Sequence, residues 1–491
     1  MNCYYCPEKY RIILKSYPEK CHLIFMYRTI HQYLTSWFTQ SNRKPLILRG
    51  ARQVGKTSSV RILARELGLT LLEANMEDPH SFISLLKNNQ PKEIFEIMAL
   101  EHGLDEIRPD KVLIFFDEVQ ECPEIISFLR YCFERANEFA VICAGSLLEF
   151  TLAEIQTSFP VGRVEYLYMG PMTFEEYLLA NSKQGLLDRM RKITLLKDTS
   201  TAVHQLLEKE FREYLLCGGM PEAVKVQTEK SGILALEKVK ASILDSYRSD
   251  FSKYNQYTRL KPNINIIQSI FDRLPFQIGN KIKYSKLVDS ARAEQVKKSI
   301  SFLEKARILT MSYHSAASTP PLKALKNEKW FKLFYLDVGL VQTQFGVSIE
   351  AIKTARNLND VANGILTEQF IAQHLNQLKP AFYNPELYHW GRNNKGSEAE
   401  VDFLFEFEGR VYPIEVKSGT SKTMRSLVML QKEKRFPVAF RFYSGPVKTE
   451  IMSLTMENEN FKYQLISLPH YLIEQLPKII KALPPINGNN S

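Results

Sequence analysis

The stretch GARQVGKT, residues 50–57, decides the fold of the N-terminal part of this 491-residue chain. It follows an apolar run at residues 45–49 and precedes a run with helical spacing, which is the context of a phosphate-binding loop. Its backbone N–H groups would surround phosphate oxygens, while Lys56 reaches the β- and γ-phosphates and Thr57 holds Mg²⁺. The residues expected to contact nucleotide are Gly50, Ala51, Arg52, Gln53, Val54, Gly55, Lys56, Thr57 and Ser58.

A second motif, VLIFFDE at residues 112–118, places two carboxylates at the end of an apolar run. In open parallel sheets, ligands bind at the carboxyl ends of the strands. Asp117 is therefore expected to complete the Mg²⁺ shell, and Glu118 to orient or deprotonate an attacking water. The alternative, a charged strand end that only faces water, suits Glu118 alone better than the pair. ATP and Mg²⁺ are the expected cofactors.

Two further residues are candidates for a role in ATP hydrolysis, and each has an alternative structural role. Ser146 follows the run VICAG, where it would sense the γ-phosphate or else only cap a helix. Arg163, in PVGRVEY, would stabilise the transition state in the same chain or from a neighbouring copy, or else is a surface residue that starts a strand. The residues themselves leave both alternatives open.

The apolar runs at residues 45–49, 69–75, 111–117, 139–144 and 164–169 alternate with helical patterns. They are nearly continuous, as in strands of a parallel sheet that is covered on both faces, so we expect an α/β domain. Residues 171–260 are expected to be largely helical, with a turn at Gly218, Gly219 and Pro221.

Residues 262–345 contain three short helical patterns, at 263–273, 286–290 and 294–306, and then two strand patterns at 308–313 and 330–336. This order predicts a winged helix-turn-helix. Its many basic residues would neutralise DNA phosphates, or else form the solvated face of a packing domain. These residues are Arg292, Lys297, Lys298, Lys305, Arg307, Lys323, Lys326, Lys329 and Lys332.

The motifs PLILRGARQVGKT, FFDEVQECP, AGSLLEF, GRVEYLYMGPMTFEEYL, GGMPEAV and KLFYLDVGL occur in this order. They resemble a widespread prokaryotic family of AAA-type ATPases fused to a C-terminal domain of unknown function. The resemblance runs from about Met26 to the end, and implies a five-stranded ATPase core, a winged-helix segment and a restriction-endonuclease-like tail. The expected divisions are an extension (1–25), the ATPase core (26–170), a helical lid or linker (171–260), the winged helix (261–345), the nuclease-like domain (346–480) and a disordered tail (481–491).

The tail carries a second set of polar residues. A helix is expected at 361–377, strands at 400–406 and 410–417, and then more helix. Glu368 on the helix, Asp402 on the first strand, and Glu415 and Lys417 on the second have the layout of a PD-(D/E)xK nuclease core. Asp402 and Glu415 would bind Mg²⁺ or Mn²⁺, Lys417 would polarise a water, and Glu368 would add a ligand or anchor the site. Such cores also serve as silent binding modules, exposed strands often carry ExK, and Glu398 and Glu400 are alternative carboxylates.

The composition indicates which partners are possible and excludes some classes of protein. A formal net charge of +10 is compatible with nucleic acid as a partner, and the apolar runs are of buried-strand length, so no membrane partner and a cytoplasmic location are expected. Seven cysteines argue against a disulfide framework, and the Cys3–Cys6 pair lacks partners at zinc spacing. No LSGGQ-like signature of a transport ATPase occurs.

The expected fold is thus α/β: a P-loop ATPase with a parallel sheet, a helical lid, a winged helix-turn-helix and a C-terminal restriction-endonuclease-like α/β domain. The first functional hypothesis is an ATPase that couples nucleotide turnover to a DNA-binding and metal-dependent nuclease-like tail. The alternative is a nucleotide-controlled interaction module with a catalytically silent tail, which would form ATP-dependent homo-oligomers.

Overall fold

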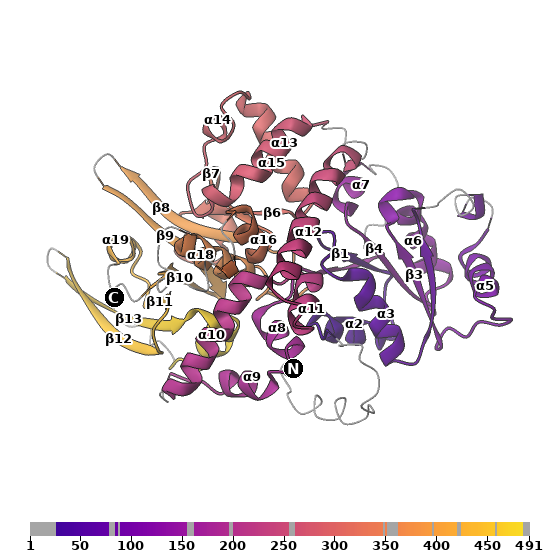
Figure 1. The fold of residues 1–491 in the computed structure, drawn as a ribbon, viewed down its shortest axis with the longest axis horizontal. Helices are drawn as coiled ribbons and strands as arrows, with labels where there is room; N and C mark the ends of the chain where they lie inside the picture. Colours follow the sequence, from indigo (N-terminus) through magenta and orange to yellow (C-terminus); the bar gives the residue numbers. More distant parts are fainter. Residues whose placement is uncertain are drawn as a thin grey trace.

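The computed structural model describes residues 26–77, 84–86, 89–154, 162–195, 200–254, 261–346, 349–350, 362–394, 397–419, 424–456 and 459–484. The expected extension with Cys3 and Cys6 lies outside the described residues, as do residues 485–491 of the expected tail. A parallel sheet and an eight-stranded sheet lie at opposite ends of the molecule, and helices of the middle of the chain lie between them (Figure 1).

The parallel sheet has five strands in the order β2-β3-β4-β1-β5. The strands are β1 (Leu46–Arg49), β2 (Thr70–Asn75), β3 (Val112–Asp117), β4 (Ala140–Gly145) and β5 (Glu165–Tyr168). All five strands expected from the sequence are therefore confirmed. The connecting elements are α3 (Lys56–Glu66), α5 (Pro91–Glu101), η2 (Val119–Glu121), α6 (Glu124–Arg135) and α7 (Leu148–Glu154), and α2 (Ile30–Phe38) precedes β1.

Both faces of this sheet are covered, which explains the continuous apolar runs. Successive residues of β3 alternate between two hydrophobic cores: Ile114 and Phe116 pack in one, and Leu113 and Phe115 in the other. Every residue of β3 and β4 is buried. The sheet therefore holds its strand ends rigidly, and the residues that follow β1, β3 and β4 lie at one edge.

The helical segment comprises α8 (Phe174–Ala180), α9 (Gln184–Arg191), α10 (Thr201–Cys217), α11 (Pro221–Thr228) and α12 (Ile233–Tyr254). Its aromatic side chains share one core with a helix of the C-terminal part, α18 (Ala362–Leu375). The rings of Phe211 and Phe370, for example, meet edge to face with centroids 4.8 Å apart. The helical segment is thus packed against the C-terminal part and not only against the domain of the parallel sheet.

The next segment contains α13 (Ile264–Arg273), η4 (Leu274–Gln277), α14 (Tyr284–Leu287), α15 (Ala293–Lys305), β6 (Leu309–Ser315), η5 (Leu322–Leu325), β7 (Lys326–Tyr335) and α16 (Val338–Gln344). Three helices and an antiparallel hairpin follow one another as expected, although the second helix begins at Tyr284 and ends before residue 290. The hairpin is the edge of the second sheet, whose order is β12-β13-β11-β10-β9-β8-β6-β7. This sheet therefore continues across the boundary expected at residue 345.

The remaining elements are α18, β8 (Leu387–Asn394), β9 (Ser397–Phe407), β10 (Arg410–Val416), α19 (Arg425–Lys434), β11 (Val438–Tyr443), β12 (Lys448–Met456), β13 (Glu459–Pro469), η6 (His470–Gln475) and α20 (Leu476–Lys481). The expected helix and two strands are present. The helix expected after residue 417 is present as α19 and α20, but three strands were not expected there: β11 joins β10 in parallel, and β12 and β13 extend the sheet. Charged and amide side chains of β12 and β13 obscure the strand pattern of these residues in the sequence.

Candidate functional site

The loop at residues 50–57 connects β1 to α3, as expected for a phosphate-binding loop. Gln53 and Gly55 have φ values of 62° and 97°, and this alternation of backbone conformation curls the loop. At Gly50 an added Cβ would fall on the carbonyl oxygen of Met169, so only glycine fits there. The loop is thus closely packed against the residue that follows β5.

Lys56 is buried, with 8% of its surface exposed. Its Nζ donates hydrogen bonds to the carbonyl oxygens of Gly50 at 3.0 Å and Ala51 at 2.8 Å. Burial lowers the pKa of Lys56 to about 8, against the opposing effect of Glu118 and Asp117. The ammonium group is therefore held by the carbonyl groups of its own loop, at the position from which it would reach phosphate.

Thr57 and Asp117 are in direct contact, because Thr57 Oγ1 donates to Asp117 Oδ2 at 2.6 Å. Burial raises the pKa of Asp117, and the hydrogen bond from Thr57 opposes that change. A hydroxyl and a carboxylate oxygen side by side are the hard ligands that Mg²⁺ takes in nucleotide sites. These two residues therefore fit the ion, which would supply positive charge to the phosphates.

Glu118 follows Asp117 in a left-handed conformation, with a φ of 51°, and its Oε2 accepts a hydrogen bond from Gln120 Nε2 at 2.7 Å. Gln120 is a residue that the sequence analysis did not select. It is buried against the end of β4, where a Cβ added to Gly145 would overlap its Oε1. Gln120 thus fixes the direction of the Glu118 carboxylate, and its place in the motif DEVQ is the only sequence signal for that role.

The structure places Ser146 where it was expected and Arg163 elsewhere. Ser146 is buried directly after β4, between the ends of β3 and β1. Arg163 precedes β5, and the pairing of Leu46 with Glu165 puts it at the opposite edge of the sheet from the loop. Its Nε lies 3.4 Å from Glu134 Oε1 and 47% of its side chain is exposed. In this conformation Arg163 is therefore not brought to the loop of its own chain, and a role for it in the reaction stays a prediction.

The helical segment holds the phosphate-binding loop from outside. Tyr247 Oη on α12 donates to the carbonyl oxygen of Arg52 at 2.6 Å, and Asp250 Oδ2 lies 2.6 Å from Arg52 Nη1. On another side, Arg28 donates to the carbonyl oxygen of Val54 at 2.7 Å. None of these three partners was selected from the sequence, because their contacts join residues far apart in the chain.

Arg28 connects the phosphate-binding loop, the residues after β5 and α8 of the helical segment. Besides Val54, it donates to the carbonyl oxygen of Gly170 at 2.6 Å and to Glu176 Oε2 at 2.8 Å. Both side chains of the Arg28–Glu176 pair are almost fully buried. The guanidinium group therefore holds the Val54 carbonyl toward Arg28, which directs the N–H group of the same trans peptide the opposite way.

The motifs GGMPEAV and YLDVGL meet through one buried carboxylate. Asp337 Oδ2 accepts a hydrogen bond from Gly219 N at 2.6 Å, and Oδ1 accepts one from Gly339 N at 2.9 Å. Burial raises the pKa of Asp337 to about 6, although these hydrogen bonds oppose the change. The two motifs are therefore a structural junction between α10 and α16.

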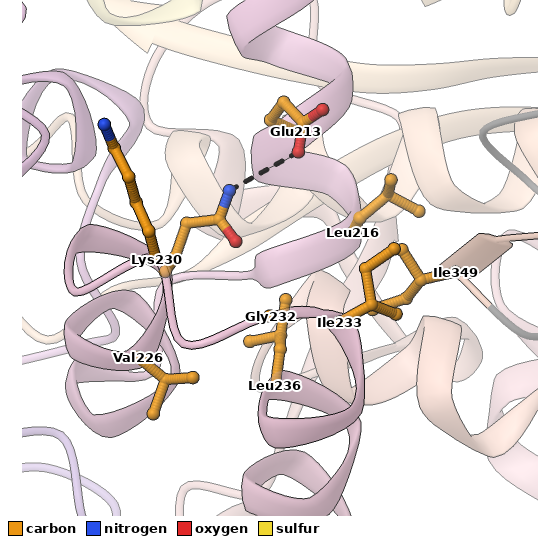
Figure 2. Close-up of a pocket in the computed structure, with 9 residues that line it drawn as sticks. Glu213, Leu216, Val226, Lys230, Gly232, Ile233, Leu236 and Ile349 are labelled. Atoms are coloured by element: carbon orange, nitrogen blue, oxygen red, sulfur yellow. Dashed lines mark hydrogen bonds between the residues drawn. The ribbon is translucent and has the colours of Figure 1, made fainter.

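A pocket of about 230 Å³ lies between the end of α10, α11 and the start of α12. Figure 2 shows Leu216, Ile233 and Ile349 on one side of it and Lys230 with Val226 on the other. Its lining contains no residue of the loop at residues 50–57, so this pocket is separate from the expected phosphate site.

The four residues selected in the C-terminal part do come together. Lys417 Nζ lies 2.6 Å from Glu415 Oε1, and Asp402 Oδ2 accepts a hydrogen bond from Val416 N at 2.7 Å. Burial raises the pKa of Glu415 to about 8, with Asp402 adding to the effect, and raises that of Glu368 to about 7. Glu400, noted as an alternative carboxylate, also belongs to this group, whereas Glu398 is exposed.

A sixth residue of the cluster, Lys332, was assigned to DNA by the sequence analysis. Lys332 on β7 is 0% exposed, and its Nζ lies 3.2 Å from Glu368 Oε1 and 2.5 Å from Glu400 Oε1. Its assignment to DNA is wrong because it faces the acidic cluster. Arg307 is half-buried and lies 2.8 Å from Glu149 of α7, so in this conformation it contacts the domain of the parallel sheet.

The comparisons with known families divide the chain into three segments. Residues 42–178 match a family described as an AAA domain (AAA_14). Residues 208–351 and 363–470 match two domains of unknown function, DUF8612 and DUF4143. No curated protein matches the chain.

Several solved structures are similar to the chain at low sequence identity. The Walker-type ATPase PABY2304 of Pyrococcus abyssi is 12% identical, with a TM-score of 0.40 over 68% of this chain and 99% of that chain. The Aeropyrum pernix ORC2 protein in ADPNP–ADP complexes is 12% identical, with a TM-score of 0.32 over 70% and 98%. The Thermotoga maritima RuvB Holliday junction branch migration motor is 13% identical, with a TM-score of 0.26 over 57% and 88%.

Among the described residues, no helix has the length and apolar character needed to span a membrane. The parallel sheet, the phosphate-binding loop after β1 and the carboxylates after β3 agree with the family match over the same residues. Residues 42–178 are therefore a P-loop ATPase domain of the AAA class.

Proposed function

We propose that this protein hydrolyses ATP with Mg²⁺ and uses the turnover to reposition its winged-helix segment on DNA. The observation that carries the ATPase part is the contact of Thr57 with Asp117 at the mouth of the phosphate-binding loop, with Glu118 beside it. Lys56 would bind the β- and γ-phosphates, Thr57 and Asp117 would hold the ion, and Glu118 would accept a proton from the attacking water. Ser146 would contact the γ-phosphate from the end of β4.

The coupling part of the proposal rests on α7, the helix that begins two residues after Ser146. Glu149 of α7 pairs through one oxygen with Arg49, the last residue of β1, and through the other with Arg307 at 2.8 Å. Arg307 lies two residues after the end of α15, the helix expected to face DNA. One carboxylate therefore joins the residue before the phosphate-binding loop to the winged-helix segment.

The apolar side of α7 supports the same connection. The rings of Phe150 and Phe302 lie 5.0 Å apart, and both side chains are buried, so α7 packs directly onto α15. The Arg307 guanidinium also lies over the ring of Tyr168 at the end of β5, 4.8 Å from its centroid. A displacement of the strand ends on ATP binding would therefore be transmitted to α15, because packed helices move as units.

DNA is the proposed partner of the exposed basic side chains that remain after the corrections. They lie on or next to α15, in the connection between β6 and β7, and at the start of β7. Two half-buried lysines, Lys305 and Lys326, lie in the same elements. Binding through phosphates would be independent of sequence and would weaken steeply with salt. The exposed residues are Arg292, Lys297, Lys298, Lys323 and Lys329.

The decisive experiment measures ATP turnover and DNA affinity on the same preparations. Wild type should hydrolyse ATP, Lys56→Ala should not, and the affinity for a fluorescent duplex should differ between the nucleotide-free and ATP-bound states. Glu149→Gln should keep turnover but remove that difference. Glu73→Gln, which breaks the exposed Arg61–Glu73 pair elsewhere in the core, is the matched control. Equal DNA affinity in all nucleotide states of wild type would refute the coupling and leave the ATPase assignment standing.

A metal-dependent nuclease is a second candidate for the C-terminal part. The specific observation in its favour is the assembly of Glu368, Asp402, Glu415 and Lys417, together with Glu415 Oε2, which is buried and has no hydrogen-bond partner among the described residues. Incubation of supercoiled plasmid with wild type and Asp402→Ala, in Mg²⁺ or Mn²⁺ and with or without ATP, tests it. Wild type that never nicks the plasmid would exclude this activity and favour a silent interaction module, for which sedimentation should detect ATP-dependent self-association.

A further inference from the structure

The C-terminal acidic cluster contains a positive charge that the chain itself supplies. Lys332 is fully buried, and its Nζ lies 2.5 Å from Glu400 Oε1, 3.2 Å from Glu368 Oε1 and 3.8 Å from Asp402 Oδ1. One ammonium group therefore lies against three carboxylates at once.

A divalent cation does not fit this arrangement well. Mg²⁺ and Ca²⁺ need several oxygens at about 2.0–2.6 Å from the ion. Here the oxygens of Glu368 and Glu400 converge on the ammonium group, and Asp402 Oδ2 is used by the Val416 N–H group. Within the described ranges, no group of three or more His, Cys, Asp or Glu side chains has an arrangement that could hold a metal ion. A metal beside Lys332 would also have to share these carboxylates with a second cation.

We propose that Lys332 takes the place of a divalent cation in the C-terminal carboxylate cluster, and that this cluster is an ion-pair junction between β7, α18 and β9. The three elements come from two different matched segments, because Lys332 lies in residues 208–351 and Glu368 and Glu400 lie in residues 363–470. Gly279, in the turn after η4, packs against the junction so closely that an added Cβ would overlap Glu368 Oε2. The proposal competes with the nuclease candidate and is independent of ATP turnover.

One consequence is that loss of the ammonium group should create a cation site. Lys332→Met keeps the length of the side chain but leaves Glu368, Glu400 and Asp402 without their shared positive partner. Uncompensated buried carboxylates are strongly unfavourable, so the thermal midpoint should fall. Ca²⁺ should then bind the carboxylates and restore part of the midpoint, on the order of 2–4 °C or more.

The test is thermal unfolding of the nucleotide-free full chain in EDTA and in millimolar Ca²⁺. The midpoint of wild type should not respond to Ca²⁺, that of Lys332→Met should rise, and that of Lys332→Met/Asp402→Asn should rise less or not at all. An equal response of wild type and Lys332→Met would overturn the proposal. Because Lys332→Met could fail to fold, Mn²⁺ binding by wild type and Asp402→Asn is measured by electron paramagnetic resonance as well. A tightly bound Mn²⁺ that wild type holds and Asp402→Asn loses would also overturn the proposal, whereas identical Mn²⁺ binding by the two proteins supports it.

Discussion

Lys56 donates a hydrogen bond to the carbonyl oxygen of Ala51 at 2.8 Å, so the lysine that should bind phosphate is held by its own loop. Burial lowers its pKa to about 8 in this state. The lysine is therefore charged below about pH 8 and increasingly neutral above it. Bound phosphates favour the charged form, so binding should raise the pKa again.

The first prediction is that ATP binding takes up protons above pH 8 and weakens as the pH rises further. Titration calorimetry in two buffers with different ionisation enthalpies measures this uptake directly. Lys56→Arg is the matched control, because arginine stays charged over this range and has no proton to gain. Proton uptake by Lys56→Arg equal to that of wild type would assign the effect to another group.

Glu118→Gln should separate ATP binding from hydrolysis. The amide keeps the size of the side chain and still offers an oxygen to Gln120 Nε2, which lies 2.7 Å from Glu118 Oε2 in the native chain. It cannot accept a proton from water, so turnover should fall about 10²–10⁴-fold while nucleotide affinity stays close to that of wild type. Full turnover by Glu118→Gln would show that another group activates the water.

Arg28→Gln should raise the KM for ATP with a smaller change in kcat. The native guanidinium donates to the carbonyl oxygen of Val54 at 2.7 Å, and its loss would let that peptide rotate and withdraw an N–H group from the phosphates. A buried charged hydrogen bond contributes about 1.5–3 kcal/mol, so we expect a change of roughly 10- to 100-fold.

The control for Arg28→Gln is Arg43→Gln, and the readout is steady-state ATPase kinetics. Arg43 also donates to backbone carbonyl groups, including that of Glu138 at 2.6 Å, but these lie outside the phosphate-binding loop. Its KM should therefore be unchanged. Equal changes in both variants would indicate a general loss of stability, and Arg28→Lys should recover part of the wild-type KM.

The parts of the fold that the sequence predicts correctly are those with local signals. The five strands of the parallel sheet follow from continuous apolar runs, and the positions of Lys56, Thr57 and Asp117 follow from the strand ends that carry them. The assembly of Asp402, Glu415 and Lys417 is predicted because adjacent strands carry these residues. In each case a short stretch of sequence fixes both the element and the direction of its side chains.

The parts that the sequence does not reveal depend on contacts between distant residues. In the sequence, Lys332 lies among polar and charged residues, as a surface lysine does. Only the pairing of β6 with β8 brings its strand close to the carboxylates. Arg163 lies in a promising motif, but the register of β5 puts it at the wrong edge of the sheet. Arg28 and Tyr247 support the phosphate-binding loop from 26 and 195 residues away, and no periodicity in the sequence reports such contacts.

The final prediction concerns the junction between the motifs GGMPEAV and YLDVGL. Gly219 N donates to Asp337 Oδ2 at 2.6 Å, and an added Cβ at Gly219 would fall on the carbonyl oxygen of Met172. In Gly219→Ala, the backbone at residue 219 or at Met172 must therefore move. Such a shift in a closely packed region lowers the free energy of unfolding by about 1–3 kcal/mol. The thermal midpoint of the full chain should fall accordingly.

Gly185→Ala is the matched control, because it makes the same chemical change at a position with space. Gly185 lies in α9, and a Cβ added there has nothing within 4 Å. Alanine is favoured over glycine in a helix by roughly 0.5–1 kcal/mol, so this variant should be as stable as wild type or more so. If Gly219→Ala melted at the wild-type temperature, the two motifs would not form the rigid junction inferred from Asp337. If both variants melted early, the loss would reflect the general sensitivity of the helical segment and not the contact with Met172.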